Sequence, residues 1–269
     1  MRSISILLLT VLMFGCAPET APPSPVDTTE RLEETPRHHE WVTIESAGRP
    51  LHAYVAYPER SDAAPAVLVI HENRGLTDWV RSVADQLAER GYLAIAPDLL
   101  SGSGPGGGRT KDFPSEDAAR EGIYALDMNR VATDLRSAAD WVRARPAASG
   151  TLYVAGFCWG GSRSWEVANA YDPLAGAFVF YGTGPDEPSG TAGIDAPVWG
   201  FYGGDDARVN ATIPRSEEIM RAAGKPFEPV IYDGAGHAFM RLGEQPDASE
   251  ANRAARERAW ERWLGHLER

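Results

Sequence analysis

The chain has 269 residues, of which 43% are hydrophobic and 9% aromatic, and its formal net charge is −12. The length suits one large domain, and the apolar content is sufficient for a packed core, which excludes global disorder. An acidic chain of this kind lacks the basic footprint of a nucleic-acid-binding protein and the polybasic patch that anionic membrane surfaces attract.

The N-terminus carries a short apolar segment that predicts export. Arg2 precedes an apolar run of roughly a dozen residues, the length of a signal-peptide core and too short to span a bilayer as a helix. The run ends in Gly15-Cys16, which resembles the lipobox of bacterial lipoproteins, and this resemblance implies that Cys16 is lipidated. We therefore expect residues 1–16 to be a lipoprotein-type signal peptide and the exported protein to face the periplasm, anchored to the membrane only through Cys16. A plain secretory signal with an unanchored, secreted product is the alternative.

Residues 17–40 are rich in Pro, Thr and Glu, and we interpret them as a tether to a folded domain at 41–269. In that domain, apolar runs typical of buried strands alternate with segments of helical periodicity. Strands are predicted at 41–46, 51–58, 65–71, 92–100, 150–157, 174–182, 196–204 and 227–233, and helices at 76–91, 128–145, 161–171, 213–223 and 249–267. This alternation predicts an α/β fold with a mostly parallel sheet covered by helices on both faces.

The chain has two cysteines, and if Cys16 carries lipid then Cys158 is the remaining thiol. Cys158 is the centre of Gly156-Phe157-Cys158-Trp159-Gly160, between a predicted strand and a predicted helix, which is the nucleophile elbow of α/β-hydrolases. The glycines avoid collisions in a very tight turn, and the Trp159 backbone N–H at the helix N-terminus can bind an oxyanion. A small buried thiol without chemistry is the alternative.

Such an elbow requires an acid and a histidine on later loops, in the order nucleophile, acid, histidine. Asp205 and Asp206 follow the second strand after the elbow, and His237 follows the last strand. His237 is the histidine that both comes after the acid and lies in a loop at the end of a strand. A structural histidine remains the alternative.

Four segments, IHENRGL, GFCWGG, GGDD and GAGHAF, occur in an order that resembles the dienelactone hydrolase family, a cysteine-using branch of the α/β-hydrolases. The resemblance spans the chain from about residue 40 to its end. It implies an α/β-hydrolase fold and a catalytic triad of Cys158, His237 and Asp206, with Asp206 matching the family's acid and Asp205 as its neighbour.

The same resemblance assigns roles to the IHENRGL segment. It implies that Glu72 contacts the thiol of the resting enzyme, and that the backbone N–H of Asn73 completes the oxyanion hole with that of Trp159. A carboxylate beside a thiol disfavours the thiolate, because two negative charges would share a small site. A salt bridge between Glu72 and Arg74 is the alternative.

Three arginines are candidates for binding the substrate. Arg241 matches one of the two arginines with which dienelactone hydrolase holds the substrate carboxylate, whereas Leu100-Ser101-Gly102 stand where the other is expected. Arg109, in the loop that follows, is a candidate substitute, and Arg74 is a third candidate.

Taken together, these features predict a hydrolase of carboxylic esters or lactones that works through a Cys-His-Asp triad and a covalent acyl-enzyme. We expect a small-molecule ester or lactone as its substrate and no metal or other cofactor. The alternatives are a thioesterase or peptidase-like acyl hydrolase with the same triad, and a non-catalytic lipid-anchored binding protein on a hydrolase scaffold.

Overall fold

A computed structural model describes residues 28–268 of the chain. The predicted signal peptide, Cys16 and the first part of the predicted tether lie outside the described residues. Between residues 28 and 268, no helix is long and apolar enough to cross a membrane.

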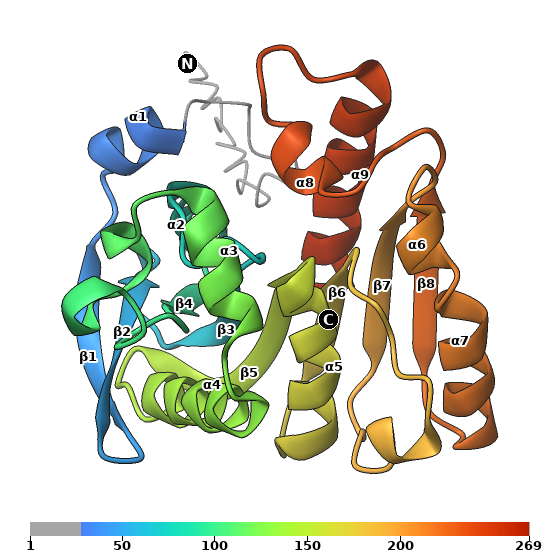
Figure 1. The fold of residues 1–269 in the computed structure, drawn as a ribbon, viewed down its shortest axis with the longest axis horizontal. Coiled ribbons are helices and arrows are strands. Elements are labelled where there is room, and N and C mark those ends of the chain that lie inside the picture. Colours follow the sequence, from blue (N-terminus) through green and yellow to red (C-terminus); the bar gives the residue numbers. More distant parts are fainter. Residues whose placement is uncertain (1–27, 269) are drawn as a thin grey trace, which may run out of the picture.

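The centre of the fold is an eight-stranded sheet with the strand order β1-β2-β4-β3-β5-β6-β7-β8 (Figure 1). The pairs β1–β2 and β2–β4 are antiparallel, and all the others are parallel. The strands are β1 (His39–Ser46), β2 (Arg49–Ala56), β3 (Ala64–Ile70), β4 (Leu93–Pro97), β5 (Ala148–Phe157), β6 (Gly176–Phe180), β7 (Val198–Gly203) and β8 (Phe227–Tyr232). Because β3, β5, β7 and β8 run in the same direction, the loops after them meet at one edge of the sheet.

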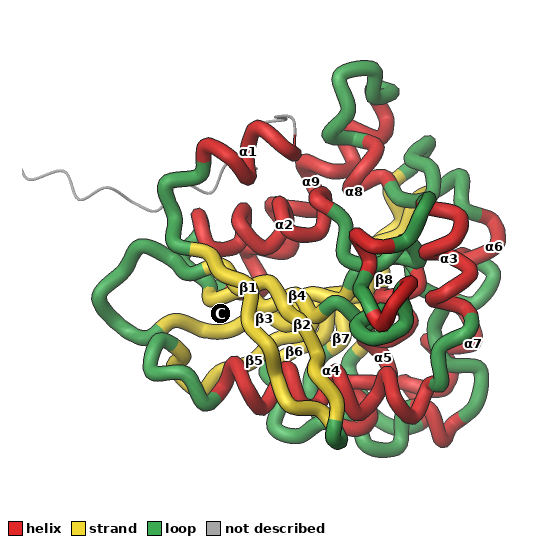
Figure 2. The backbone as a smooth tube through the Cα atoms, turned by 60° about the vertical axis from the view of Figure 1, so that its left-hand side comes forward, coloured by secondary structure: helices red, strands yellow, loops and turns green. Residues whose placement is uncertain are grey.

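Helices cover both faces of the sheet (Figure 2). The α-helices are α1 (Thr28–Glu34), α2 (Asp78–Glu89), α3 (Glu116–Tyr124), α4 (Met128–Arg143), α5 (Trp159–Ala170), α6 (Ala207–Asn210), α7 (Ile213–Ala222), α8 (Phe239–Leu242) and α9 (Glu250–Leu267). Short 3-10 turns lie at Pro105–Gly107, Thr110–Asp112 and Pro188–Gly190. The apolar faces of α2 and α9 pack in one core, and those of α4, α5 and α7 pack in a second core on the other face. The predicted α/β class, with a mostly parallel sheet between two helical layers, is confirmed.

The end of the predicted tether is folded rather than extended. Residues 28–34 form α1, whose Leu32 is buried in the core that contains α2. The Asp85 carboxylate on α2 accepts hydrogen bonds from Thr35 Oγ1 at 2.6 Å and from Arg37 Nε at 2.9 Å, and its side chain is fully buried. The expectation of a tether through residue 40 is therefore wrong for residues 28–40. A buried carboxylate needs partners of this kind, and it finds them on the segment before β1.

Candidate active site

Cys158 lies in the sharp turn between β5 and α5, with φ 55° and ψ −116°. Glycine is required on both sides of this turn, at positions 156 and 160, because a side chain would collide with the backbone. A Cβ at Gly156 would lie 2.0 Å from the carbonyl oxygen of Gly160, and a Cβ at Gly160 would lie 2.4 Å from that of Ile70. Non-glycine residues in this region of φ/ψ space cost about 1–3 kcal/mol and cluster at functional sites.

The three residues of the predicted triad lie together. His237 Nε2 is 3.1 Å from Cys158 Sγ, and His237 Nδ1 is 2.5 Å from Asp206 Oδ2. Asp206 is 7% exposed and also caps α6 through the backbone N–H of Val209. Asp205 is exposed, so it is Asp206 that reaches the imidazole. This arrangement suits a neutral imidazole that donates from Nδ1 and accepts a proton at Nε2.

The environment of Cys158 keeps the resting sulfur protonated. Burial and the negative charge of Glu72 raise the pKa of the Cys158 thiol to about 11. Backbone N–H groups of Trp159 and Asn73 hydrogen-bond to the sulfur and act in the opposite direction, as does the positive charge of Arg208. The same two N–H groups are placed to stabilise an oxyanion formed next to the sulfur.

Glu72 pairs with Arg241 and not with Arg74. Arg241 Nε donates to Glu72 Oε2 at 2.7 Å, and the Glu72 side chain is 6% exposed. Arg74 forms a salt bridge with Glu116 on α3 instead. The alternative of a Glu72–Arg74 salt bridge is therefore wrong, because the long Arg241 side chain reaches Glu72 from α8.

Two cavities open at the nucleophile. The larger has a volume of about 570 Å³ and is lined by Asn73, Tyr124, Cys158, Trp159, Ser162, Arg163, Tyr181, Thr183, Arg208 and His237. The smaller, about 160 Å³, is lined by Glu72, Asn73, Arg74, Arg120, Cys158, His237, Ala238 and Arg241. Of the predicted substrate-binding arginines, Arg241 and Arg74 lie at the smaller cavity.

The third candidate, Arg109, lines neither cavity. Its Cζ is 3.7 Å from the centroid of the Trp41 ring on β1, and Trp41 is 39% exposed. The expectation that Arg109 replaces the missing arginine is therefore wrong, because a cation–π contact with Trp41 holds its side chain elsewhere.

Sequence reasoning missed two residues of the site, Tyr181 and Arg208. Tyr181 follows β6 with φ 42°, is 1% exposed and meets the His237 ring edge-on with 5.1 Å between the centroids. Burial and the charge of Glu72 raise its pKa well above the usual value. Arg208 stands two residues after Asp206, so its position beside the acid was the one signal in the sequence. The strained backbone of Tyr181 has no signal in the sequence.

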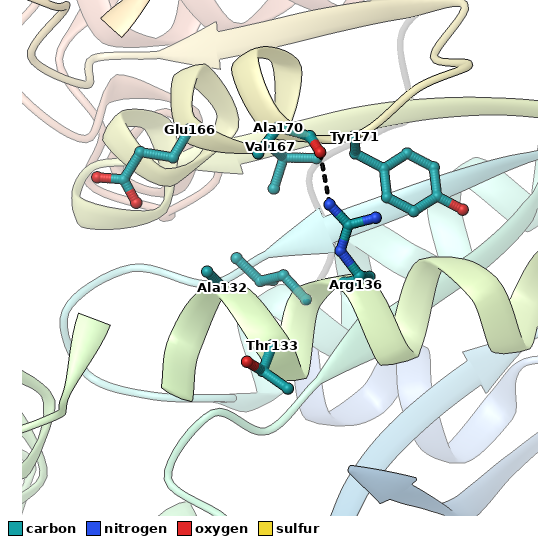
Figure 3. A pocket seen from close by; sticks show the side chains of 8 residues that line it. Ala132, Thr133, Arg136, Glu166, Val167, Ala170 and Tyr171 are labelled. Carbon is teal, nitrogen blue, oxygen red and sulfur yellow. Dashed lines mark hydrogen bonds between the residues drawn. The ribbon is translucent and has the colours of Figure 1, made fainter. Parts of the chain in front are cut away.

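A further cavity of about 160 Å³ lies between α4 and α5 (Figure 3). Arg136 at this cavity donates a hydrogen bond at 2.5 Å to the Ala170 carbonyl oxygen, which has no partner within α5 because it lies at the end of the helix. The lining of this cavity contains no thiol or histidine, and we assign the cavity no chemistry. Among residues 28–268, no group of three or more His, Cys, Asp and Glu side chains is arranged to hold a metal ion.

The fold and the geometry at Cys158 define an α/β-hydrolase with a cysteine at the nucleophile position. Comparison with known proteins then identifies the family. The model of the dienelactone hydrolase family matches residues 51–269. The chain belongs to this family, as its motifs predict, and its enzyme class is that of the carboxylic ester and lactone hydrolases.

Individual relatives agree with this assignment. The chain is 30% identical over 227 residues to a carboxymethylenebutenolidase of Pseudomonas putida, with 81% of this chain and 93% of that protein covered. It is 34% identical over 210 residues to a Salmonella typhimurium protein that is provisionally named a carboxymethylenebutenolidase. This match covers 74% of this chain and 76% of the relative. A crystal structure from Klebsiella pneumoniae, provisionally named a dienelactone hydrolase, superimposes with a TM-score of 0.76 at 27% identity and covers 87% of this chain and 100% of that chain.

Proposed function

We propose that the protein hydrolyses small carboxylic esters or lactones through a thioester intermediate on Cys158. The observation that carries this proposal is the unbroken contact from Cys158 Sγ through His237 to Asp206, with two backbone N–H groups at the sulfur. The nucleophile, its base, the group that orients the base and the oxyanion donors are then all within reach of one substrate carbonyl.

In the first half-reaction, Sγ attacks the carbonyl carbon while its proton goes to His237 Nε2, directly or relayed through Glu72. The N–H groups of Trp159 and Asn73 hold the oxyanion of the tetrahedral intermediate. When the intermediate collapses, the C–O bond breaks and His237 gives the proton to the departing alkoxide oxygen. The acyl group remains on sulfur as a thioester.

In the second half-reaction, a water molecule replaces the departed alcohol. His237 takes a proton from the water as its oxygen attacks the thioester, and it returns the proton to the thiolate that leaves. Asp206 keeps the imidazole oriented and stabilises its positive charge in both halves. The products are a carboxylic acid and an alcohol, or a hydroxy acid from a lactone.

A hydrolysis panel of lactones, aryl esters and thioesters, with the Cys158→Ala variant alongside, tests this proposal. Turnover of lactones or oxygen esters that the variant lacks would support it. A strong preference for thioesters would favour the thioesterase alternative. Binding of esters without turnover would instead favour the non-catalytic alternative.

We infer further that the substrate carries a negative charge, because Arg208 adds a positive charge to the larger cavity. Arg208 is exposed, and no ion pair of its side chain is found between residues 28 and 268. Arg208→Gln is expected to lower kcat/KM for an anionic aryl hemisuccinate about tenfold, the effect of roughly 1.4 kcal/mol of lost attraction. The neutral aryl butyrate should change less than about twofold, because it loses only the effect of Arg208 on the thiol, which is the smallest of the influences on the Cys158 pKa, whereas the anion also loses the charge attraction.

Arg215→Gln is the matched control for this experiment, because Arg215 lies on α7 and pairs there with Glu218 at 2.8 Å. Arg215→Gln should change kcat/KM for neither substrate. Equal losses for the two substrates in Arg208→Gln would contradict the charge inference without touching the proposed reaction.

For the N-terminus we propose a lipid anchor at Cys16, supported by Arg2, the short apolar run and Gly15-Cys16. The protein should fractionate with membranes, and Cys16→Ser should release it or leave it unprocessed. The measurement is mass spectrometry of the mature N-terminus. A mature chain that begins at another, unmodified residue would contradict the anchor and leave a secreted protein.

A further inference from the structure

His71 is a fully buried titratable residue that the proposed reaction does not use. It follows β3 directly and opens the loop that carries Glu72 and Asn73, and it is 0% exposed. A histidine at this depth must satisfy both ring nitrogens, so its partners show what it holds together.

The two ring nitrogens of His71 contact two different loops. Nδ1 is 2.7 Å from the carbonyl oxygen of Glu72, and Nε2 is 3.3 Å from the backbone nitrogen of Leu99. A backbone N–H can only donate, so Nε2 is the acceptor and Nδ1 carries the proton that goes to Glu72. Burial lowers the pKa of His71, which keeps the ring in this neutral form.

The loop after β4, whose Leu99 N–H donates to His71 Nε2, is itself held in place by hydrogen bonds. The Asp98 carboxylate accepts from Thr110 Oγ1 at 2.6 Å, from the Thr110 backbone nitrogen at 3.1 Å and from that of Leu100 at 3.2 Å. Asp98 is 1% exposed. Leu99, between these anchored residues, therefore offers His71 a fixed donor.

The ring of His71 also packs against the nucleophile elbow. It stacks on the ring of Trp159, with 5.7 Å between the centroids and 12° between the planes. The backbone of His71 also lies against the elbow, since a Cβ at Gly160 would lie 2.5 Å from the His71 carbonyl oxygen. His71 thus contacts both segments whose N–H groups face Cys158 Sγ.

We propose that His71 is a positioning residue that fixes Glu72 and the Asn73 N–H against Cys158 by joining their loop to the Leu99 backbone and to the Trp159 ring. Its effect on turnover rests on the proposed function, whereas its effect on the thiol does not. The alkylation rate of the Cys158 thiol is therefore the primary measurement, and it needs no substrate.

The experiment measures the pH dependence of Cys158 alkylation by iodoacetamide in a double-mutant cycle of His71→Phe and Glu72→Gln in the full chain. Phenylalanine keeps the ring on Trp159 but loses both hydrogen bonds. Glu72 raises the pKa of Cys158, and the Asn73 N–H lowers it. Displacing their loop should therefore lower the pKa of Cys158 when Glu72 is present, and leave it unchanged or raise it in the Glu72→Gln background.

A shift that depends in this way on residue 72 supports the proposal. Equal shifts in the two backgrounds, including no shift in either, overturn it, because His71 would then act on the thiol without moving Glu72. If His71→Phe does not fold, His71→Asn takes its place in the cycle, since its shorter side chain cannot bridge the two loops.

Two further variants separate positioning from general stability. His71→Gln keeps a donor and an acceptor on one side chain. The Cys158 pKa in this variant should therefore shift by no more than half as much as in His71→Phe. His266→Phe is the matched control, because His266 is a buried histidine on α9 that stacks on Trp199 at 4.4 Å and lines neither cavity at Cys158. It should leave the alkylation profile unchanged whatever it does to the melting temperature.

On an ester that the protein turns over, His71→Phe should lower kcat by about tenfold to a hundredfold, less than the loss of a whole oxyanion donor. KM should stay within about twofold, because the displaced N–H acts on the transition state. A change in KM alone would overturn the positioning role. If no ester is hydrolysed by the unmodified protein, the proposed function fails, while the alkylation cycle still decides the role of His71.

Discussion

Cys158→Ala, His237→Ala and Asp206→Asn are each expected to lower kcat by roughly a hundredfold to ten-thousandfold in folded protein. The first removes the atom that carries the acyl group, and the second removes the base 3.1 Å from it. Asp206→Asn removes the negative charge that lies 2.5 Å from Nδ1, and its amide NH2 can donate to Nδ1, which favours the tautomer with the proton on Nε2 and so blocks the base. Steady-state kinetics on the best ester of the panel, with circular dichroism to verify folding, is the measurement.

Asp205→Asn is the matched control for the acid, because it makes the same change at the exposed neighbour. It should leave kcat within about twofold, as expected for a surface substitution. If Asp205→Asn proved crippling and Asp206→Asn mild, the assignment of the acid would be wrong. Near-full activity of Cys158→Ala would contradict the thioester mechanism as a whole.

Glu72→Gln is expected to speed alkylation of Cys158 at neutral pH by about tenfold while turnover falls. The carboxylate raises the pKa of the thiol towards about 11, so removing its charge lowers that pKa and increases the thiolate fraction. At a pH well below the pKa, each unit by which the pKa falls raises the thiolate fraction about tenfold. The thiolate is the form that alkylating agents and oxidants attack. Burial is the larger cause of the raised pKa and persists in the variant, so the thiol should still titrate above its ordinary range.

The measurement is the iodoacetamide rate from about pH 7 to pH 11, with peroxide inactivation and turnover beside it. Turnover should fall because the carboxylate proposed to relay the thiol proton is gone. Glu116→Gln makes the same change on exposed α3, where Glu116 pairs with Arg74, and it should leave the profile intact. Identical profiles for Glu72→Gln and the unmodified protein would show that Glu72 does not act on the thiol.

The periodicity of the sequence was sufficient to predict the sheet and most of the helices. The run at 65–71 became β3 (Ala64–Ile70), and the amphipathic segment at 128–145 became α4 (Met128–Arg143). Both signals are local, because a strand buried on both faces must be apolar throughout and a helix on a sheet must be apolar along one side. Helix α3 escaped prediction, since its nine residues bury only Ala119 and Ile123.

The sequence by itself also determined where the reacting groups are, because a parallel sheet brings the loops after its strands to one edge. The order of Cys158, the acid and His237 along the chain was enough to expect them there. Only the tertiary structure decided which partner each side chain takes. Glu72 meets Arg241 across 169 positions of sequence, Arg109 lies on Trp41, and Thr35, after α1, binds Asp85. These pairings depend on side-chain reach and burial between segments far apart in the chain, which no local pattern of residues encodes.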